Sequence, residues 1–106
     1  MRILLDACVP RGLRRSLVGH DISIPREMGW NKLPDGLLLD AMSGVFDVLV
    51  TVDRSMQFQQ RLRDRTFAVI LLRAKSNKLI DLLPLVPALL RALDEVKPGE
   101  LREIKA

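Results

Sequence analysis

The chain has little cysteine and few aromatic residues, and each shortage excludes a class of protein. Its 106 residues include one cysteine, no tyrosine and an aromatic share of 4%. A single cysteine excludes an internal disulfide framework and a cysteine-rich zinc site, so a reducing cytoplasm is the simplest compartment. The scarcity of aromatic rings argues against a base-stacking platform for single-stranded nucleic acid.

Three sequence features of other protein classes are also missing. No glycine-rich loop of the P-loop or dinucleotide-binding kind occurs. No apolar stretch approaches the ~20 residues of a membrane span, so we expect no membrane partner. The N-terminus runs directly into a predicted strand, and we expect no signal peptide.

What the chain does have is aliphatic residues and positive charge. Hydrophobic residues make up 48% of it, enough for the core of one domain spanning residues 1–106. The formal net charge is +4, and the sequence pI is about 9.8. This charge permits a polyanionic partner without identifying one.

The hydrophobic pattern predicts alternating strands and helices. The strands are expected at residues 2–5, 20–25, 46–52, 67–72 and 100–105, and the helices at 10–18, 35–43, 54–63 and 79–96. Short continuous apolar runs are typical of strands buried on both faces of a parallel sheet, and alternating runs are typical of edge strands. Pro84 and Pro87 predict a kink or a break in the last helical region. This order predicts a three-layer α/β/α sandwich with a central, mostly parallel five-stranded sheet.

Two aspartates close buried strands and are the strongest candidates for chemistry. Asp6 follows the first strand and Asp53 follows the strand at 46–52. The functional crevice of an open α/β sheet lies outside the carboxyl ends of its strands, where the two side chains could converge. Two carboxylates held close together repel unless a cation lies between them, which predicts a divalent-metal site. The structural alternatives are a solvated loop residue for Asp6 and a helix N-cap for Asp53.

A third acid, Asp35, opens the second predicted helix and is either a metal ligand or an N-cap. Asp40 lies five residues further, about 140° around the helix, so the two cannot both point at one ion and Asp40 is a weaker fourth candidate. Aspartate oxygens suit Mg²⁺ or Mn²⁺. Zinc is disfavoured because His20 and Cys8 stand alone, without ligand spacing. Asp47, before a strand, is expected at the opposite sheet edge, on the surface.

Five basic residues are expected near these acids and are candidates for binding a phosphate backbone. They are Arg11, Arg15, Arg54, Arg73 and Lys75. The first two share the helix after Asp6, and the last two follow the third buried strand at its carboxyl end. They are expected to hold phosphates, with a solvated charged surface as the alternative. Phosphodiester hydrolysis would use both the acids and the basic residues. A divalent metal lowers the pKa of bound water, so no protein nucleophile is needed.

Four segments of the chain form a pattern that is more specific than any of them alone. They are, in order, Ile3-Leu4-Leu5-Asp6 with Val9-Pro10, Gly19-His20-Asp21-Ile22, Asp35-Gly36-Leu37-Leu38-Leu39-Asp40-Ala41 and Val48-Leu49-Val50-Thr51-Val52-Asp53-Arg54. In this order they resemble the PIN-like domain proteins, and the nearest branch is that of small proteins related to the toxins of toxin–antitoxin modules. The resemblance covers most of the chain to about residue 73, and residues 30–33 have no match in the pattern.

The resemblance implies an α/β/α sandwich with an acidic Mg²⁺ or Mn²⁺ site that cleaves single-stranded RNA. The family's acids carry over onto Asp6, Asp35 and Asp53, and Asp40 is the only nearby candidate for the fourth acid of many members. The implied function is that of a ribonuclease toxin, with RNA and an antitoxin protein as its partners.

Two other functions remain open. One is a PIN-like interaction or regulatory module with weak or no catalytic activity. The other is a phosphoacceptor domain of the receiver type, which would need Lys75 beside the acids. A homodimer is also open, because the final helical region is apolar nearly all round and must be covered by the sheet, a partner chain or both.

Overall fold

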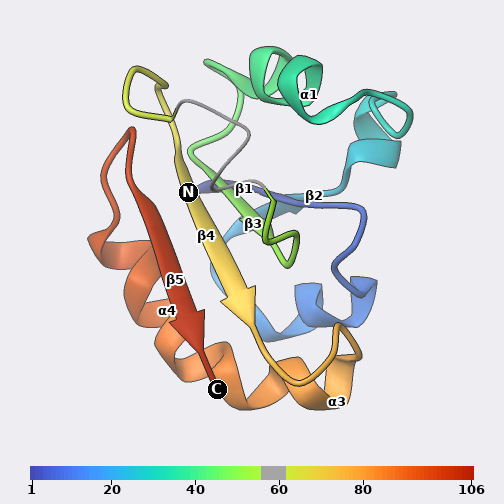
Figure 1. Cartoon of the computed structure of the whole chain (residues 1–106), viewed down its shortest axis with the longest axis vertical. Coiled ribbons are helices and arrows are strands. Elements are labelled where there is room, and N and C mark those ends of the chain that lie inside the picture. Colours follow the sequence, from blue (N-terminus) through green and yellow to red (C-terminus); the bar gives the residue numbers. More distant parts are fainter. Residues whose placement is uncertain (56–61) are drawn as a thin grey trace.

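The computed structural model describes residues 1–55 and 62–106 and has a five-stranded, all-parallel sheet at its centre. The strand order is β2-β1-β3-β4-β5 (Figure 1). The strands are β1 (Arg2–Leu5), β2 (Asp21–Ser23), β3 (Val48–Thr51), β4 (Ala68–Arg73) and β5 (Leu101–Lys105). The predicted α/β class and central parallel sheet are confirmed, with the two alternating segments as the edge strands.

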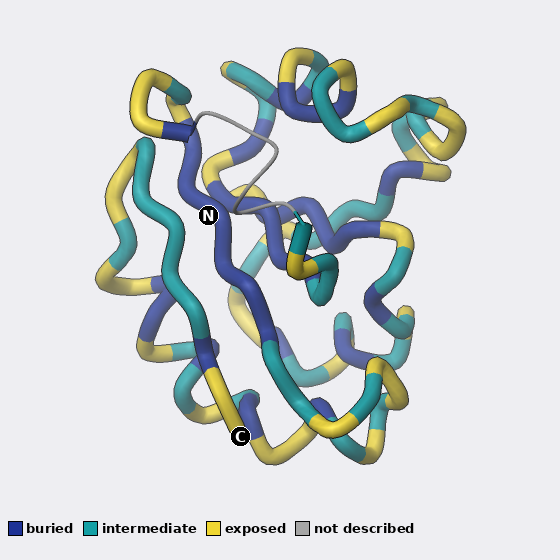
Figure 2. Tube along the Cα trace, in the orientation of Figure 1, coloured by how far each residue is buried: buried dark blue, intermediate teal, exposed yellow. Residues whose placement is uncertain are grey.

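Alternate residues of the strands face two separate halves of the core, which makes the fold three-layered. Leu4 and Leu49 lie in the half that packs against α1 (Asp35–Met42). Ile3 and Val50 lie in the other half, which is covered by helical segments. These segments are η1 (Arg11–Ser16), α3 (Leu79–Leu82), η3 (Leu83–Leu85) and α4 (Val86–Glu95). The central strands β1, β3 and β4, mostly dark blue in Figure 2, are buried between the two layers, whereas the edge strands β2 and β5 are more exposed.

The first predicted helix is a shorter 3₁₀ helix, η1, rather than an α-helix over 10–18. Pro10 precedes it in an extended conformation. A Cβ atom on Gly12 would lie 2.6 Å from Cδ2 of Leu79, so the absence of a side chain lets η1 pack closely against α3. A second 3₁₀ helix, η2 (Pro25–Met28), begins at Pro25, the last residue of the strand predicted at 20–25, and β2 ends at Ser23.

The final helical region is interrupted at both prolines, as the sequence predicts. Pro84 lies in the first turn of η3, and Pro87 lies in the first turn of α4. The apolar face of this region packs on the sheet through Leu82, Leu85 and Leu89. The sheet therefore provides the expected cover, and a homodimer stays a prediction.

One predicted helix, at 54–63, falls mainly on residues 56–61 and so lies outside the described residues. Within the described ranges, no helix is both long enough and apolar enough to cross a membrane.

Candidate active site

Asp6 and Thr51 lie side by side where β1 and β3 end. The parallel register pairs Leu5 with Val50, and the amide of Asp6 donates to the carbonyl oxygen of Val50 at 2.9 Å. The next residues along each strand are therefore neighbours, and Thr51 Oγ1 donates to Asp6 Oδ2 at 2.8 Å. The amide of Ala7 donates to Asp6 Oδ1 at 2.8 Å. Asp6 is only 9% exposed, and these bonds satisfy both oxygens of a carboxylate that would otherwise be costly to bury.

Thr51 also connects Asp6 to Asp53. The amide of Asp53 donates to Thr51 Oγ1 at 3.0 Å. Asp53 Oδ1 in turn accepts from the amide of Ser55 at 3.0 Å and from its hydroxyl at 2.6 Å. This local turn is one that aspartate commonly forms. The helix that Asp53 would cap falls mainly outside the described residues, so the capping alternative stays a prediction. The turn also fixes the direction of the Asp53 carboxylate.

Asp35 approaches Asp6 and Asp53 from the helical layer that contains α1. It is the first residue of α1, whose N-cap is Pro34, and no side chain caps this helix. Its pKa is raised above the usual value, first by burial, then by repulsion from Asp53 and Asp6, and by a hydrogen bond with Asp53. The structure thus brings together three acids from separate elements. The alternation of side chains along a strand explains this. Leu4 and Leu49 pack on the α1 side of the sheet. Asp6 lies two residues after Leu4, and Thr51 lies two residues after Leu49, so both face the same side.

The three acids have the oxygen ligands that a hard divalent cation prefers, but their side chains are not arranged around a common point. Carboxylate oxygens are the preferred ligands of Mg²⁺ and Mn²⁺, and the repulsion felt by Asp35 is of the kind that a cation relieves. Within residues 1–55 and 62–106, however, no three His, Cys, Asp or Glu side chains are positioned to hold a metal ion. The three acids interact electrostatically, and they would have to close around an ion in order to bind it.

Asp40 is not brought to this cluster. Its Oδ1 pairs with Arg65 Nη1 at 2.6 Å, and its side chain is 62% exposed. Arg65 lies just before β4, at the amino edge of the sheet, so Asp40 is directed away from the carboxyl edge. The helical phase predicted this separation from Asp35. Asp47 is on the surface at the amino edge, as expected, and accepts a hydrogen bond from the amide of Arg2 at 2.8 Å.

Two pockets lie at the carboxyl edge and contain four of the five predicted basic residues. Arg11 and Asp6 line a pocket of about 190 Å³. Its other lining residues are Ala7, Val9, Ile24, Pro25, Arg26 and Asn31. Arg54, Arg73 and Lys75 line a second pocket of about 240 Å³ beyond β3 and β4. Arg15 is exposed on η1 and lines neither of these pockets.

Ser76, after β4, has a local structural role. Its hydroxyl donates to Asp81 Oδ2 at 2.5 Å and accepts from the amide of Lys78 at 3.0 Å. These bonds hold the start of α3, whose N-cap is Lys78.

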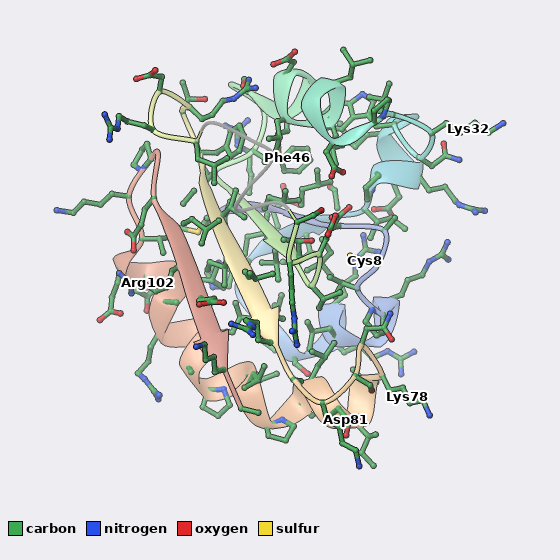
Figure 3. The ribbon with its side chains drawn as sticks, viewed as in Figure 1. Cys8, Lys32, Phe46, Lys78, Asp81 and Arg102 are labelled. Atoms are coloured by element: carbon green, nitrogen blue, oxygen red, sulfur yellow. The ribbon has the colours of Figure 1, made fainter. Side chains whose placement is uncertain are left out.

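Cys8 lies close to the cluster but is not activated. Its sulfur is 3.6 Å from Thr51 Oγ1. Because the single proton of the Thr51 hydroxyl goes to Asp6, the thiol is the donor in this contact. Burial raises the pKa of Cys8, and the negative charge of Asp6 raises it further. A protonated thiol is a poor nucleophile, so Cys8 is not a candidate catalytic residue. Figure 3 labels Cys8 in the loop that follows β1.

The sequence did not identify three residues of this region. Thr51 appeared only as part of the Thr-x-Asp-Arg segment, although its spacing of two from Asp53 is a signal for the same sheet face. Arg26 and Asn31 line the pocket beside Asp6. The sequence of this segment does not indicate that it lies near Asp6, because its position depends on how η2 folds back toward β1.

Comparisons with known proteins identify no relative of this chain. No protein-family model, curated protein or solved structure matches the chain. The resemblance to PIN-like proteins therefore stays a prediction from the sequence segments that suggest it.

Proposed function

We propose that this protein is a metal-dependent ribonuclease of PIN-like type that hydrolyses single-stranded RNA. The observation that carries the proposal is the chain of hydrogen bonds through Thr51 that joins Asp6 and Asp53 where β1 and β3 end; the raised pKa of Asp35, which results in part from Asp53 and Asp6, agrees with it. Three acids separated in the sequence meet at the carboxyl edge of a parallel sheet, where α/β proteins place their functional groups. Like charges held close together without a compensating ion repel one another, so the convergence of buried Asp6 with half-buried Asp35 and Asp53 favours a cation-binding function.

Asp6, Asp35 and Asp53 are the residues that would hold Mg²⁺ or Mn²⁺. When bound, such an ion shields the charge of the phosphodiester and lowers the pKa of water. The protein's own contribution is orientation. Thr51 fixes the Asp6 carboxylate, and Ser55 fixes that of Asp53. Asp35 extends from the start of α1.

The basic residues support a polyanionic substrate. Arg11 lies in the pocket that includes Asp6, and Arg54 and Lys75 lie in the pocket beyond β3 and β4. Cations on both sides of an acidic cluster suit a phosphate backbone that crosses it, because phosphate contacts position a nucleic acid without reading its sequence. The net charge of +4 would also speed the approach of RNA. The family resemblance supports a cytoplasmic toxin held inactive by an antitoxin protein as the biological setting.

The test is RNA cleavage with Mg²⁺ or Mn²⁺ by the wild type and by Asp53→Asn. We expect the variant to lose at least about 100-fold in rate, because it removes one of three anionic ligands. Asp47→Asn is the matched control, since it removes an exposed aspartate at the opposite sheet edge, and it should retain the wild-type rate. Equal rates for wild type and Asp53→Asn, or no cleavage of structured and unstructured RNAs, would refute the proposal.

A second function is supported by the arrangement of the acids. Because no three acidic, His or Cys side chains in the described residues are positioned around an ion, the fold also suits an inactive interaction module. Calorimetry with Mn²⁺ separates the two functions. Heat of binding that is lost in Asp35→Asn supports the nuclease, whereas no heat at millimolar Mn²⁺ supports the interaction module.

A further inference from the structure

The pocket beyond β3 and β4 has a composition different from that of the acidic cluster. Its volume is about 240 Å³. Its lining residues are Val52, Arg54, Leu72, Arg73, Ala74, Lys75, Ser76 and Asn77. Val52 and Leu72 belong to the half of the core that faces α3 and α4. This apolar part of the pocket therefore lies on the side of β3 opposite to α1, while Arg73, the residue after Leu72 in β4, faces the α1 side of the sheet, where the acids lie.

This pocket has an excess of positive charge. Arg73 Nη1 pairs with Glu103 at 2.7 Å, which neutralises one of the three cations. Its Nε atom is buried and has no hydrogen-bond partner among the residues that the structure describes. Arg54 and Lys75 are exposed, and neither forms an ion pair within the described part of the chain. Two uncompensated cations and a buried donor are a recognition surface for an anion.

Size and position restrict which anion this is. Pockets for drug-sized ligands are about 300–1,000 Å³, so this pocket suits a small charged group better than a whole nucleotide. Asp53 and Arg54 are consecutive residues, and consecutive Cα atoms are about 3.8 Å apart. The acidic cluster and this pocket therefore meet in the loop that follows β3.

We propose that this pocket binds one phosphate group of the RNA strand, adjacent to the linkage that is cleaved, and that it does so without metal. Arg54 and Lys75 supply the charge, and Arg73 also lines the pocket. The identification of the ligand as RNA rests on the proposed function. The anion-binding capacity of the pocket does not, because it arises from residues outside the acidic cluster.

The test is a binding titration in EDTA with a fluorescent single-stranded octadeoxynucleotide, for the wild type, Lys75→Ala and Arg54→Ala. Lys78→Ala is the matched control, because Lys78 is an exposed lysine of the same loop and does not line the pocket. Figure 3 labels Lys78 beside Asp81 at the start of α3. We expect each pocket variant to weaken binding about fivefold and to reduce the slope of log K against log salt by about 0.7. Lys78→Ala should change the affinity less than about twofold.

If the pocket binds the phosphate, a variant inside the pocket must weaken binding more than a variant that removes one positive charge outside it. Equal weakening by Lys75→Ala and Lys78→Ala would show a diffuse field and overturn the proposal, as would unchanged affinity in both pocket variants. Inorganic pyrophosphate should compete with the oligonucleotide on the wild type and compete less on Lys75→Ala. If pyrophosphate competes equally on both proteins, the phosphate is bound elsewhere and the proposal is wrong.

The outcome is distinguishable from that of the nuclease test. If the protein cleaves no RNA but Lys75→Ala weakens binding as expected, the phosphate pocket stands and the nuclease proposal falls. If RNA is cleaved and Lys75→Ala binds as the wild type does, the nuclease stands and the pocket proposal falls. Asp53→Asn should not weaken binding in EDTA, because without a cation its carboxylate repels phosphate.

Discussion

Thr51 and Asp6 are joined by a buried hydrogen bond of 2.8 Å that links the ends of two neighbouring strands. The same hydroxyl oxygen accepts from the amide of Asp53 at 3.0 Å, so one side chain positions two of the three acids. Thr51 is completely buried, and neither partner can exchange this bond for water without rearrangement.

Thr51→Val should therefore destabilise the protein by about 1–3 kcal/mol. The substitution keeps the shape of the side chain but leaves a buried carboxylate oxygen and a backbone amide without a partner. Urea denaturation measures the loss. Thr51→Ser keeps the hydroxyl and should lose only about 1 kcal/mol for the missing methyl group. Thr66→Val, at an exposed threonine, is the control and should change stability by less than about 0.5 kcal/mol. A Thr51→Val protein as stable as the wild type would show that the bond has no structural role.

Asp35→Asn should stabilise the fold near neutral pH in the absence of metal. The folded state raises the pKa of Asp35 through burial and through repulsion from Asp53 and Asp6. A carboxyl whose folded pKa is raised favours folding while it is protonated, and this contribution is lost as the pH rises through its folded pKa. The variant does not ionise, so its advantage should be largest at pH 7 and disappear below the ordinary aspartate pKa of about 3.9.

The gain should stay below about 1 kcal/mol, because solvent screens much of the repulsion at this partly exposed site. Thermal unfolding of both proteins in EDTA, from pH 3 to pH 8, measures the difference. Asp47→Asn is the control and should show no such pH-dependent gain. A variant less stable than the wild type at pH 7 would contradict the electrostatic account of the cluster.

Much of this fold was predictable because the strands carry a strong local signal. The runs ending at Leu5 and Thr51 are buried on both faces, as their continuous apolar sequence indicates. The 3₁₀ helices were less predictable, since η1 depends on a close approach between Gly12 and Leu79, which are distant in sequence.

The acidic site was predictable in part for a similar reason. Parallel strands end at one edge, so Asp6 and Asp53 were expected there without knowledge of the strand order. The role of Thr51 needs the register between β1 and β3, which a single sequence does not specify. The partner of Asp40 is 25 residues away, so helical phase could exclude Asp40 from the site but could not identify Arg65.

Asp40→Asn should leave RNA cleavage within about twofold of the wild-type rate. Its carboxylate pairs with Arg65 on the surface, and exposed ion pairs contribute about 0–1 kcal/mol to stability. Cleavage rates and urea denaturation for Asp40→Asn and for Asp35→Asn, on the same helix, measure the contrast. A rate loss in Asp40→Asn equal to that in Asp35→Asn would mean that Asp40 acts as a fourth ligand.

Cys8 should react slowly with iodoacetamide in the folded protein at pH 8. Burial and the charge of Asp6 both raise its pKa, and only the thiolate is nucleophilic. The chain has one cysteine, so mass spectrometry follows a single adduct. We expect alkylation about tenfold slower than in urea-unfolded protein. Asp6→Asn removes the negative charge but keeps an oxygen that accepts from Thr51, so it should accelerate the reaction, while Asp47→Asn should not. Equal rates in Asp6→Asn and the wild type would show that the carboxylate does not control the thiol.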